Sequence, residues 1–181
     1  MIYFWPDNIY NDADVSATSQ GGGFDAAQIQ SSVSEVNGEI ETTLRVDIGG
    51  GSIVSSGDAD DVIGEDGVAA AYITRITTAL NGIVYRGEMA CLEVPTTGDA
   101  NINLCADSDG TIAEDAGSMD HILVDGGTWT LGKTHVFPSV TGSIPAGGIV
   151  DDYLYLTHGG TTAGTYDAGQ FIIKLYGAKT I

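Results

Sequence analysis

The sequence is dominated by short runs in which β-branched, aliphatic or aromatic residues alternate with polar ones, each closed by a turn rich in Gly, Asp, Asn or Thr. Eight such runs lie at 40–48, 72–78, 83–94, 102–106, 121–125, 128–132, 152–159 and 170–177. Successive side chains of a strand point to opposite faces, so a period of two predicts strands. Many short strands separated by turns are typical of a sandwich or barrel. We therefore expect an all-β fold, an antiparallel β-sandwich of jelly-roll-like type.

Asn81-Gly82 is a candidate hairpin turn, since this dipeptide readily adopts the positive φ angles that a tight hairpin needs. It lies between the runs 72–78 and 83–94 and predicts a hairpin that joins them. In the second run, alternation places one set of residues on a common face: Ile83, Tyr85, Met89 and Cys91. The opposite face holds Val84, Arg86, Glu88 and Leu92. One of these faces is expected to meet the core.

Residues 25–37 show a helix-like pattern. Asp25 stands where a helix N-cap would be. Apolar residues then recur at spacings of three, four and three: Ala26, Ile29, Val33 and Val36. This pattern predicts one short helix that ends at Asn37-Gly38. In the competing interpretation, Asn37-Gly38 forms a hairpin turn between two strands, and the sequence leaves both open.

The first 24 residues differ from the rest and predict an extended N-terminal arm, followed by a single domain over 25–181. They begin with an aromatic cluster and continue through a polar stretch to three successive glycines. Exposed aromatic side chains are costly unless a partner buries them. We therefore expect the arm to dock into a partner or a neighbouring subunit. The candidate partner-binding residues are Tyr3, Phe4, Trp5, Ile9 and Tyr10.

Acidic residues outnumber basic ones by 25 to 6, which gives a formal net charge of −19. Such a surface repels phosphate backbones and anionic lipid, so we expect neither nucleic-acid nor membrane binding. The N-terminus has no basic region and no long apolar run, unlike a signal peptide. No apolar run approaches the roughly 18 residues of a membrane span. We expect synthesis in a cytoplasm.

No catalytic motif is recognisable, and we expect no enzymatic activity and no catalytic residue. His121, His135 and His158 are scattered among strand-type residues, with no HxH, HExxH or His-Cys spacing. No G-x-S-x-G turn accompanies them. Cys91 and Cys105 are too few for a disulfide framework. We interpret them as small buried residues, with a disulfide between neighbouring strands as the alternative.

Three acidic clusters are candidate cation sites: 58–61, 107–110 and Asp151-Asp152. Hard cations such as Ca²⁺ prefer oxygen ligands. Asp107 and Asp109 match the first and third positions of an EF-hand loop, but Ile112 stands where that loop requires Gly. We expect solvated loops with no cofactor and no metal, and calcium is the weaker alternative.

Five aromatic residues lie in or near the C-terminal strands: Trp129, Tyr153, Tyr155, Phe171 and Tyr176. Tyr153 and Tyr155 share a predicted face because they are two residues apart. We interpret the group as core packing. A carbohydrate-binding platform is the alternative, since sugars stack on flat rings.

The most distinctive pattern is SIPAGGIVDDYLYLTHGGTTAGTYDAGQFIIKLYGAKTI at 143–181. A Pro-Ala-Gly turn precedes a Tyr-Leu-Tyr-Leu strand, and a Gly-Thr-Tyr-x-Ala-Gly turn leads into a last apolar strand that ends in Tyr-Gly. This pattern, about a fifth of the chain, resembles small β-sandwich proteins of tailed bacteriophages. It is most similar to capsid decoration (cement) proteins.

The resemblance implies a non-enzymatic virion structural protein that binds the major capsid protein on the outer capsid surface and stabilises the shell. It also implies a homo-oligomer, a trimer or dimer, built from a compact β-domain and an extended terminal arm. The alternative is a carbohydrate- or receptor-binding module of a phage fibre or tail.

Overall fold

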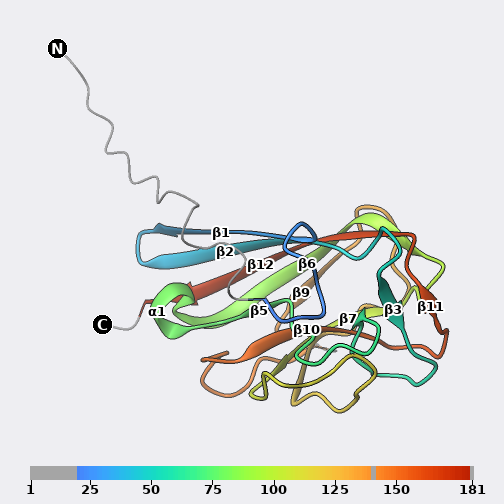
Figure 1. Cartoon of the computed structure of the whole chain (residues 1–181). Coiled ribbons are helices and arrows are strands. Elements are labelled where there is room, and N and C mark those ends of the chain that lie inside the picture. Colours follow the sequence, from blue (N-terminus) through green and yellow to red (C-terminus); the bar gives the residue numbers. More distant parts are fainter. Residues whose placement is uncertain (1–19, 140–141, 180–181) are drawn as a thin grey trace.

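The computed structural model describes residues 20–139 and 142–179, which form two facing β-sheets (Figure 1). The larger sheet has five strands in the order β1-β2-β12-β6-β9. They are β1 (Ile29–Val36), β2 (Glu39–Asp47), β12 (Ala168–Ala178), β6 (Ile83–Thr96) and β9 (Thr134–Phe137). All neighbours in this sheet are antiparallel.

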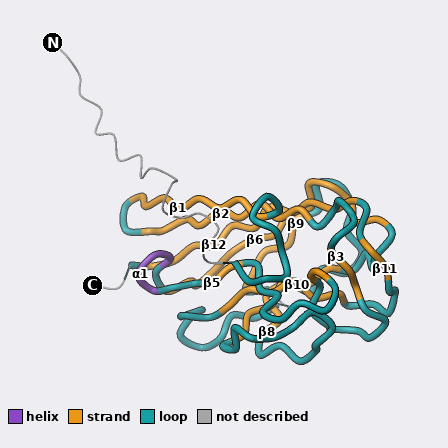
Figure 2. Tube along the Cα trace, viewed as in Figure 1, coloured by secondary structure: helices purple, strands orange, loops and turns teal. Residues whose placement is uncertain are grey.

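The second layer is a four-stranded sheet in the order β5-β10-β7-β8. Its strands are β5 (Thr74–Arg75), β10 (Tyr153–His158), β7 (Ile102–Asp107) and β8 (His121–Val124). A small sheet of β11 (Gly164–Thr165), β3 (Ile53–Ser55) and β4 (Gly64–Glu65) lies at one end of the sandwich (Figure 2). The fold is all-β and antiparallel, as predicted, and the described part of the chain has one short helix, α1 (Thr78–Asn81).

The core lies between the two layers and is formed by alternate residues of the long strands. On β12, Phe171, Ile173 and Leu175 are fully buried. The same cluster contains Leu104 of β7 and Leu156 of β10. Removing apolar surface from water, at about 25 cal/mol per Å², is what holds such layers together.

The helix predicted over 25–37 is wrong, and the competing hairpin is confirmed. β1 pairs with β2 without interruption over its whole length. Asn37 and Gly38 have φ angles of 55° and 82°, the positive values of a two-residue hairpin turn. The spacing misleads because residues four apart share a face in a strand as well as in a helix. Ile29 and Val33 both lie on the half-buried face of β1.

The hairpin predicted at Asn81-Gly82 is also wrong, because the chain passes here from one sheet to the other. Thr77 caps α1 by accepting from Leu80 N–H. The Asn81 side chain accepts from Thr77 N–H (2.8 Å) and donates to Thr42 Oγ1 (2.8 Å). β5 pairs with β10, whereas β6 pairs with β12 and β9. A local helix and a buried amide therefore replace the turn.

A bulge in β6 changes part of its predicted faces. Met89 and Cys91 are buried as one face predicts, but Val84 is buried and Tyr85 is 41% exposed. The pairing with β12 shifts by one residue between Val84 and Arg86. Such a bulge exchanges the two faces at that point. The alternation therefore holds from Gly87 to Leu92, and the pairing shifts again between Cys91 and Glu93.

The strand predicted at 128–132 is replaced by turns, and β9 lies just after it. Thr128 makes an isolated bridge to Asn101. The Trp129 side chain is 1% exposed and donates from Nε1 to Ile102 O (2.8 Å). A large apolar indole is stable in the core only when its N–H also has a hydrogen-bond acceptor. Trp129 meets both conditions through Ile102 of β7, and the chain around it is therefore not a regular strand.

Candidate functional site

The five residues predicted to bind a partner, Tyr3, Phe4, Trp5, Ile9 and Tyr10, lie outside the described residues, so their role stays a prediction. The last part of the predicted arm, residues 20–24, is described and packs against the domain. Phe24 is 3% exposed and belongs to the core cluster. The packed domain therefore begins before residue 25.

The three glycines that precede Phe24 lie where the backbone crosses the segment 70–72 at close range. Gly21 N–H donates to Tyr72 O (2.9 Å). A Cβ on Gly21 would overlap the carbonyl oxygen of Ala70, and a Cβ on Gly23 would lie 2.6 Å from the Cβ of Ala71. Backbones approach this closely only where side chains are absent. The glycines thus fix the point at which residues 1–19 join the domain.

β1 is an edge strand, because β2 pairs with one side of it and no described strand pairs with the other. In an antiparallel pair, residues whose N–H and C=O face the partner alternate with residues whose groups face away. Gln28 O accepts from Asp47 N–H (2.8 Å). The backbone N–H and C=O groups of the even-numbered residues of β1 therefore face β2, and those of the odd-numbered residues face away from it. The backbone groups of Ile29, Val33 and Glu35 therefore face the open edge, where a further strand could pair.

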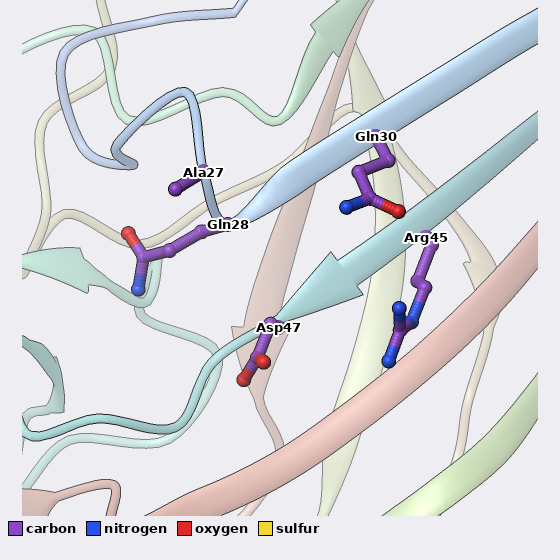
Figure 3. Close-up of a pocket in the computed structure, with 5 residues that line it drawn as sticks. All are labelled: Ala27, Gln28, Gln30, Arg45 and Asp47. Carbon is purple, nitrogen blue, oxygen red and sulfur yellow. The ribbon is translucent and has the colours of Figure 1, made fainter.

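A small hollow lies beside this edge on the outer face of the five-stranded sheet (Figure 3). Its volume is about 70 Å³, and it is lined by Ala27, Gln28, Gln30, Arg45 and Asp47. Arg45 lies opposite Gln30 in the strand pairing and donates to Gln170 Oε1 (2.7 Å). Pockets for cofactors and drug-sized ligands are several times larger. The hollow is therefore suited to a single small side chain of a partner.

Three ion pairs lie on the five-stranded sheet. They are Arg86–Glu39 (3.1 Å), Lys174–Glu41 (3.5 Å) and Lys179–Glu35 (3.0 Å). The Arg86 guanidinium also lies 3.6 Å from the ring centroid of Tyr176. Hydrogen bonds from Tyr85 and Arg86 hold the pKa of Glu39 below its ordinary value. Each of these cations is matched by a carboxylate, so the three do not form a basic patch.

The aromatic residues considered as a carbohydrate platform pack in the core. Trp129, Tyr155 and Phe171 are at most 1% exposed. The rings of Trp129 and Phe171 meet edge-on with centroids 5.2 Å apart. Tyr153 and Tyr176 are half-buried, each beside an arginine guanidinium. Core packing is confirmed for the first three residues, whose faces are closed to a sugar.

His158 lies near Ser56 and Asp61, but the three side chains are not arranged as in a Ser-His-Asp catalytic triad. Ser56 Oγ donates to Asp61 Oδ2 (2.6 Å) and lies 3.1 Å from His158 Nε2. A catalytic triad places the histidine between serine and acid, so that the histidine takes the serine proton. Here the hydroxyl donates to the acid, and His158 is fully buried. We interpret the group as a clamp between the loop 56–61 and β10.

The other residues considered for chemistry are also part of the packing. The rings of His135 and Trp129 lie edge-on with centroids 4.9 Å apart, and burial lowers the pKa of His135. His121 begins β8. Cys91 and Cys105 are buried and free, which confirms the prediction of small buried residues. Burial raises the pKa of the Cys105 thiol to about 12, so this thiol stays protonated at neutral pH.

The acidic cluster at 107–110 closes its own loop. Asp107 accepts from the N–H groups of Asp109 (2.7 Å) and Asp120 (2.9 Å), and Asp109 accepts from Thr111 N–H (2.8 Å). Within residues 20–139 and 142–179, no group of three or more His, Cys, Asp or Glu side chains is placed to hold a metal ion. Carboxylates bound to backbone N–H groups also have fewer oxygens to offer a cation.

A larger hollow of about 290 Å³ lies over β7 and β10. It is lined by Ala59, Asp60, Cys105, Ser118, Met119, Ile122 and Thr157. Cys105 Sγ lies 3.5 Å from Thr157 Oγ1. Asp60 is its one carboxylate, and its lining includes no histidine. A general acid–base pair needs two groups that can exchange protons near the working pH, and burial keeps the Cys105 thiol on this wall protonated.

Among the described residues, no helix is long and apolar enough to cross a membrane. Comparisons with protein-family models, with curated proteins and with solved structures found no match. A function for this chain therefore has to come from the geometry of its own residues.

Proposed function

We propose that this protein is a non-enzymatic structural component of a tailed-phage particle, which decorates the outer surface of the shell by binding the major capsid protein. The pattern at 143–181 and the antiparallel β-sandwich both support a decoration protein. The two hollows described above also fit this function better than catalysis, because the first is too small for a cofactor and the second has a single carboxylate and no histidine in its lining.

The main support is the fixed attachment of the aromatic N-terminal segment. The glycine crossing at 21–23 holds the start of the described chain against Tyr72. A segment that leaves a rigid body at a defined point loses less freedom on docking than one on a loose tether. Aromatic side chains bury the largest area per residue. Tyr3, Phe4 and Trp5 are therefore proposed to anchor the body to the capsid protein.

The charge of the protein supports an outside location. Its net charge of −19 repels the DNA packed inside a shell. The same charge on an outer surface keeps particles apart in solution. Many copies on one shell would also make individually weak contacts effective through multivalency.

The first test removes the anchor side chains from the full-length chain. In the variant with Tyr3→Ser, Phe4→Ser and Trp5→Ser, the unfolding midpoint should stay unchanged while co-sedimentation with undecorated shells is lost. Leu131→Ser is the matched control, because Leu131 is 73% exposed on the body and should be neutral for binding. Undiminished binding of the triple variant would contradict the anchor proposal.

The second test counts this chain against the major shell protein in purified particles by quantitative mass spectrometry. Hundreds of copies per particle are expected of a decoration protein. A handful of copies would point to a fibre, tail or vertex component instead. Absence from particles would contradict the proposal altogether.

A further inference from the structure

β1 is a long and regular edge strand, and its own residues include none of the local devices that usually protect an edge. All eight of its residues pair with β2 in one unbroken register. The other edge strands of the two main sheets are short: β9 and β8 have four residues each and β5 has two. Proteins normally block long edges with proline, lysine, a bulge or a covering segment. β1 contains no proline, no lysine and no bulge.

The edge is also nearly neutral within a strongly acidic chain. Glu35 is the single charged residue of β1, and Lys179 Nζ lies 3.0 Å from its carboxylate. Elsewhere a second copy of a chain with a net charge of −19 would be repelled. β1 itself adds little to that repulsion, because its single carboxylate is paired with Lys179.

We propose that β1 pairs antiparallel with β1 of a second copy, around a two-fold axis perpendicular to the sheet. Such an axis keeps the two outer faces on the same side, so outer-face residues meet outer-face residues. Centring the pair on Ser32 or on Val33 brings the outward backbone groups of Ile29, Val33 and Glu35 into hydrogen-bonding positions. In the first register Glu35 faces Ile29, and in the second it faces Ser31. Like charges do not meet in either one.

The hollow at the start of β1 gives this pairing a second contact. Val36, at the opposite end of the strand, is 66% exposed and lies on the same outer face as Gln30. The register centred on Ser32 places Val36 of one copy opposite Gln28 of the other. The register centred on Val33 places it opposite Gln30. Both glutamines line the hollow of about 70 Å³ (Figure 3), so each valine covers the hollow of the other copy.

The pairing closes on itself. Both copies use the same patch, so the interface is isologous and stops at two chains. The two five-stranded sheets would become one continuous sheet with β9 at both ends. This inference uses no contact of residues 1–19 and stands independently of binding to a shell.

The test measures the mass of the full-length protein by sedimentation over a range of concentrations at 0.1 M and 1 M salt. A two-chain mass is expected at the upper end of the range. The dimer should be stronger at 1 M salt, because the screening length falls from about 10 Å to about 3 Å and two acidic bodies then repel each other less. A single-chain mass throughout, or a three-chain mass, would overturn the proposal.

Val33→Pro is the deciding variant, with Val33→Ala as its matched control. Proline removes the Val33 N–H, which faces the open edge and not β2, whereas alanine keeps it. Proline should weaken dimerisation by at least about tenfold relative to alanine. A second pair avoids any effect on folding: Val36→Asp should weaken the dimer, and Leu131→Asp, on another exposed apolar side chain, should not. A dimer that resists both Val33→Pro and Val36→Asp would be held by another surface, which would refute the proposal.

Discussion

The two layers of the sandwich share one core but are ordered in different ways. In the five-stranded sheet, β6 has 14 residues, β12 has 11 and β2 has 9. The strands of the four-stranded sheet have six residues or fewer, and loops make up much of that side of the molecule (Figure 2). Continuous backbone hydrogen bonds between long strands order the first layer. The second layer has fewer of them, so its loops need other hydrogen-bond partners.

In the loops of the second layer, buried carboxylates accept hydrogen bonds from backbone N–H groups. Asp99, Asp107 and Glu114 are 6%, 5% and 8% exposed, and each accepts from backbone N–H groups of loops. Asp99 joins two loops, since it accepts from Asn101 N–H (2.8 Å) and Thr162 N–H (3.0 Å). A buried N–H without an acceptor is costly, so these carboxylates replace a ladder.

The basic residues are also distributed unequally between the two layers. Four of the six lie on the five-stranded sheet or directly after its strand β12: Arg45, Arg86, Lys174 and Lys179. Three of them form the exposed ion pairs described above. Such pairs contribute only about 0–1 kcal/mol each. Ion pairs therefore contribute little to the five-stranded sheet, whereas carboxylate oxygens in the other layer are hydrogen-bond acceptors that the fold depends on.

The largest expected effect comes from removing the side chain that joins the layers. Trp129 packs on Phe171 of β12 and donates to Ile102 O of β7. Trp129→Ala should lower the free energy of unfolding by about 3–5 kcal/mol, measured by urea denaturation. Trp129→Phe keeps a ring and loses the N–H, so it should cost less. Equal costs for the two variants would mean that the hydrogen bond, and not the packing, joins the layers.

Gly21→Ala tests the backbone crossing on the loop side. The added methyl would overlap Ala70 O, a backbone atom that cannot turn aside. A loss of about 1–3 kcal/mol is expected, as for other overpacked sites. Gly22→Ala is the control, because its Cβ would lie 3.0 Å from the Val68 Cγ1 methyl and 3.4 Å from Ala69 O, with no overlap of a backbone atom. If both variants unfold at the same urea concentration as the parent, the crossing is looser than described.

Asp99→Asn asks whether the fold of the four-stranded layer depends on both carboxylate oxygens of Asp99. The amide can accept through one oxygen only, so either Asn101 N–H or Thr162 N–H loses its acceptor. The expected cost is about 1–3 kcal/mol, with faster hydrogen exchange at the unpaired amide. Asp25→Asn makes the same charge change at an exposed position before β1 and should be neutral. Equal effects of the two variants would remove the distinction between the layers.

The smallest effects are pH responses of opposite sign. Tyr85 and Arg86 lower the pKa of Glu39, so its contribution to stability is complete above the ordinary glutamate pKa and is lost as the pH falls through the lowered value. Burial raises the pKa of Glu114, so its charged form is unfavourable and mild acid relieves that cost. Tyr85→Phe should move the carboxyl titration of Glu39 upward, and carboxyl NMR can follow both groups. An unchanged Glu39 titration would contradict the hydrogen bond from Tyr85.

Residue alternation was sufficient to predict the fold class and most of the longer strands, but not β1. It identified β2 and β12, which bury one face over many residues, and also β7 and β10, which are buried on both faces. It missed β3, β4 and β11 because two or three residues are too few to show a period. The runs around Asn81 and Trp129 were misassigned because distant partners, Thr42 and Ile102, decide their conformation.

The candidate site was harder to predict than the fold. The sequence marks the aromatic segment, but the meaning of its three glycines depends on Ala70 and Ala71, far along the chain. The open edge of β1 was hidden for a different reason. Its pattern fits a helix as well as a strand, and only pairing with β2 shows which side is left uncovered.

The glycine crossing also separates two kinds of evolutionary freedom. From Gln20 onward, substitutions are limited by close backbone approaches and by a core that includes Phe24. Upstream of Gln20, a different sequence would inherit the same take-off point. On the proposal that the upstream segment binds a partner, a recombination event or a designer could exchange that segment and so change the partner. The sandwich would then serve as a scaffold for exchangeable N-terminal segments. A foreign peptide fused ahead of Gln20 would be displayed on this scaffold.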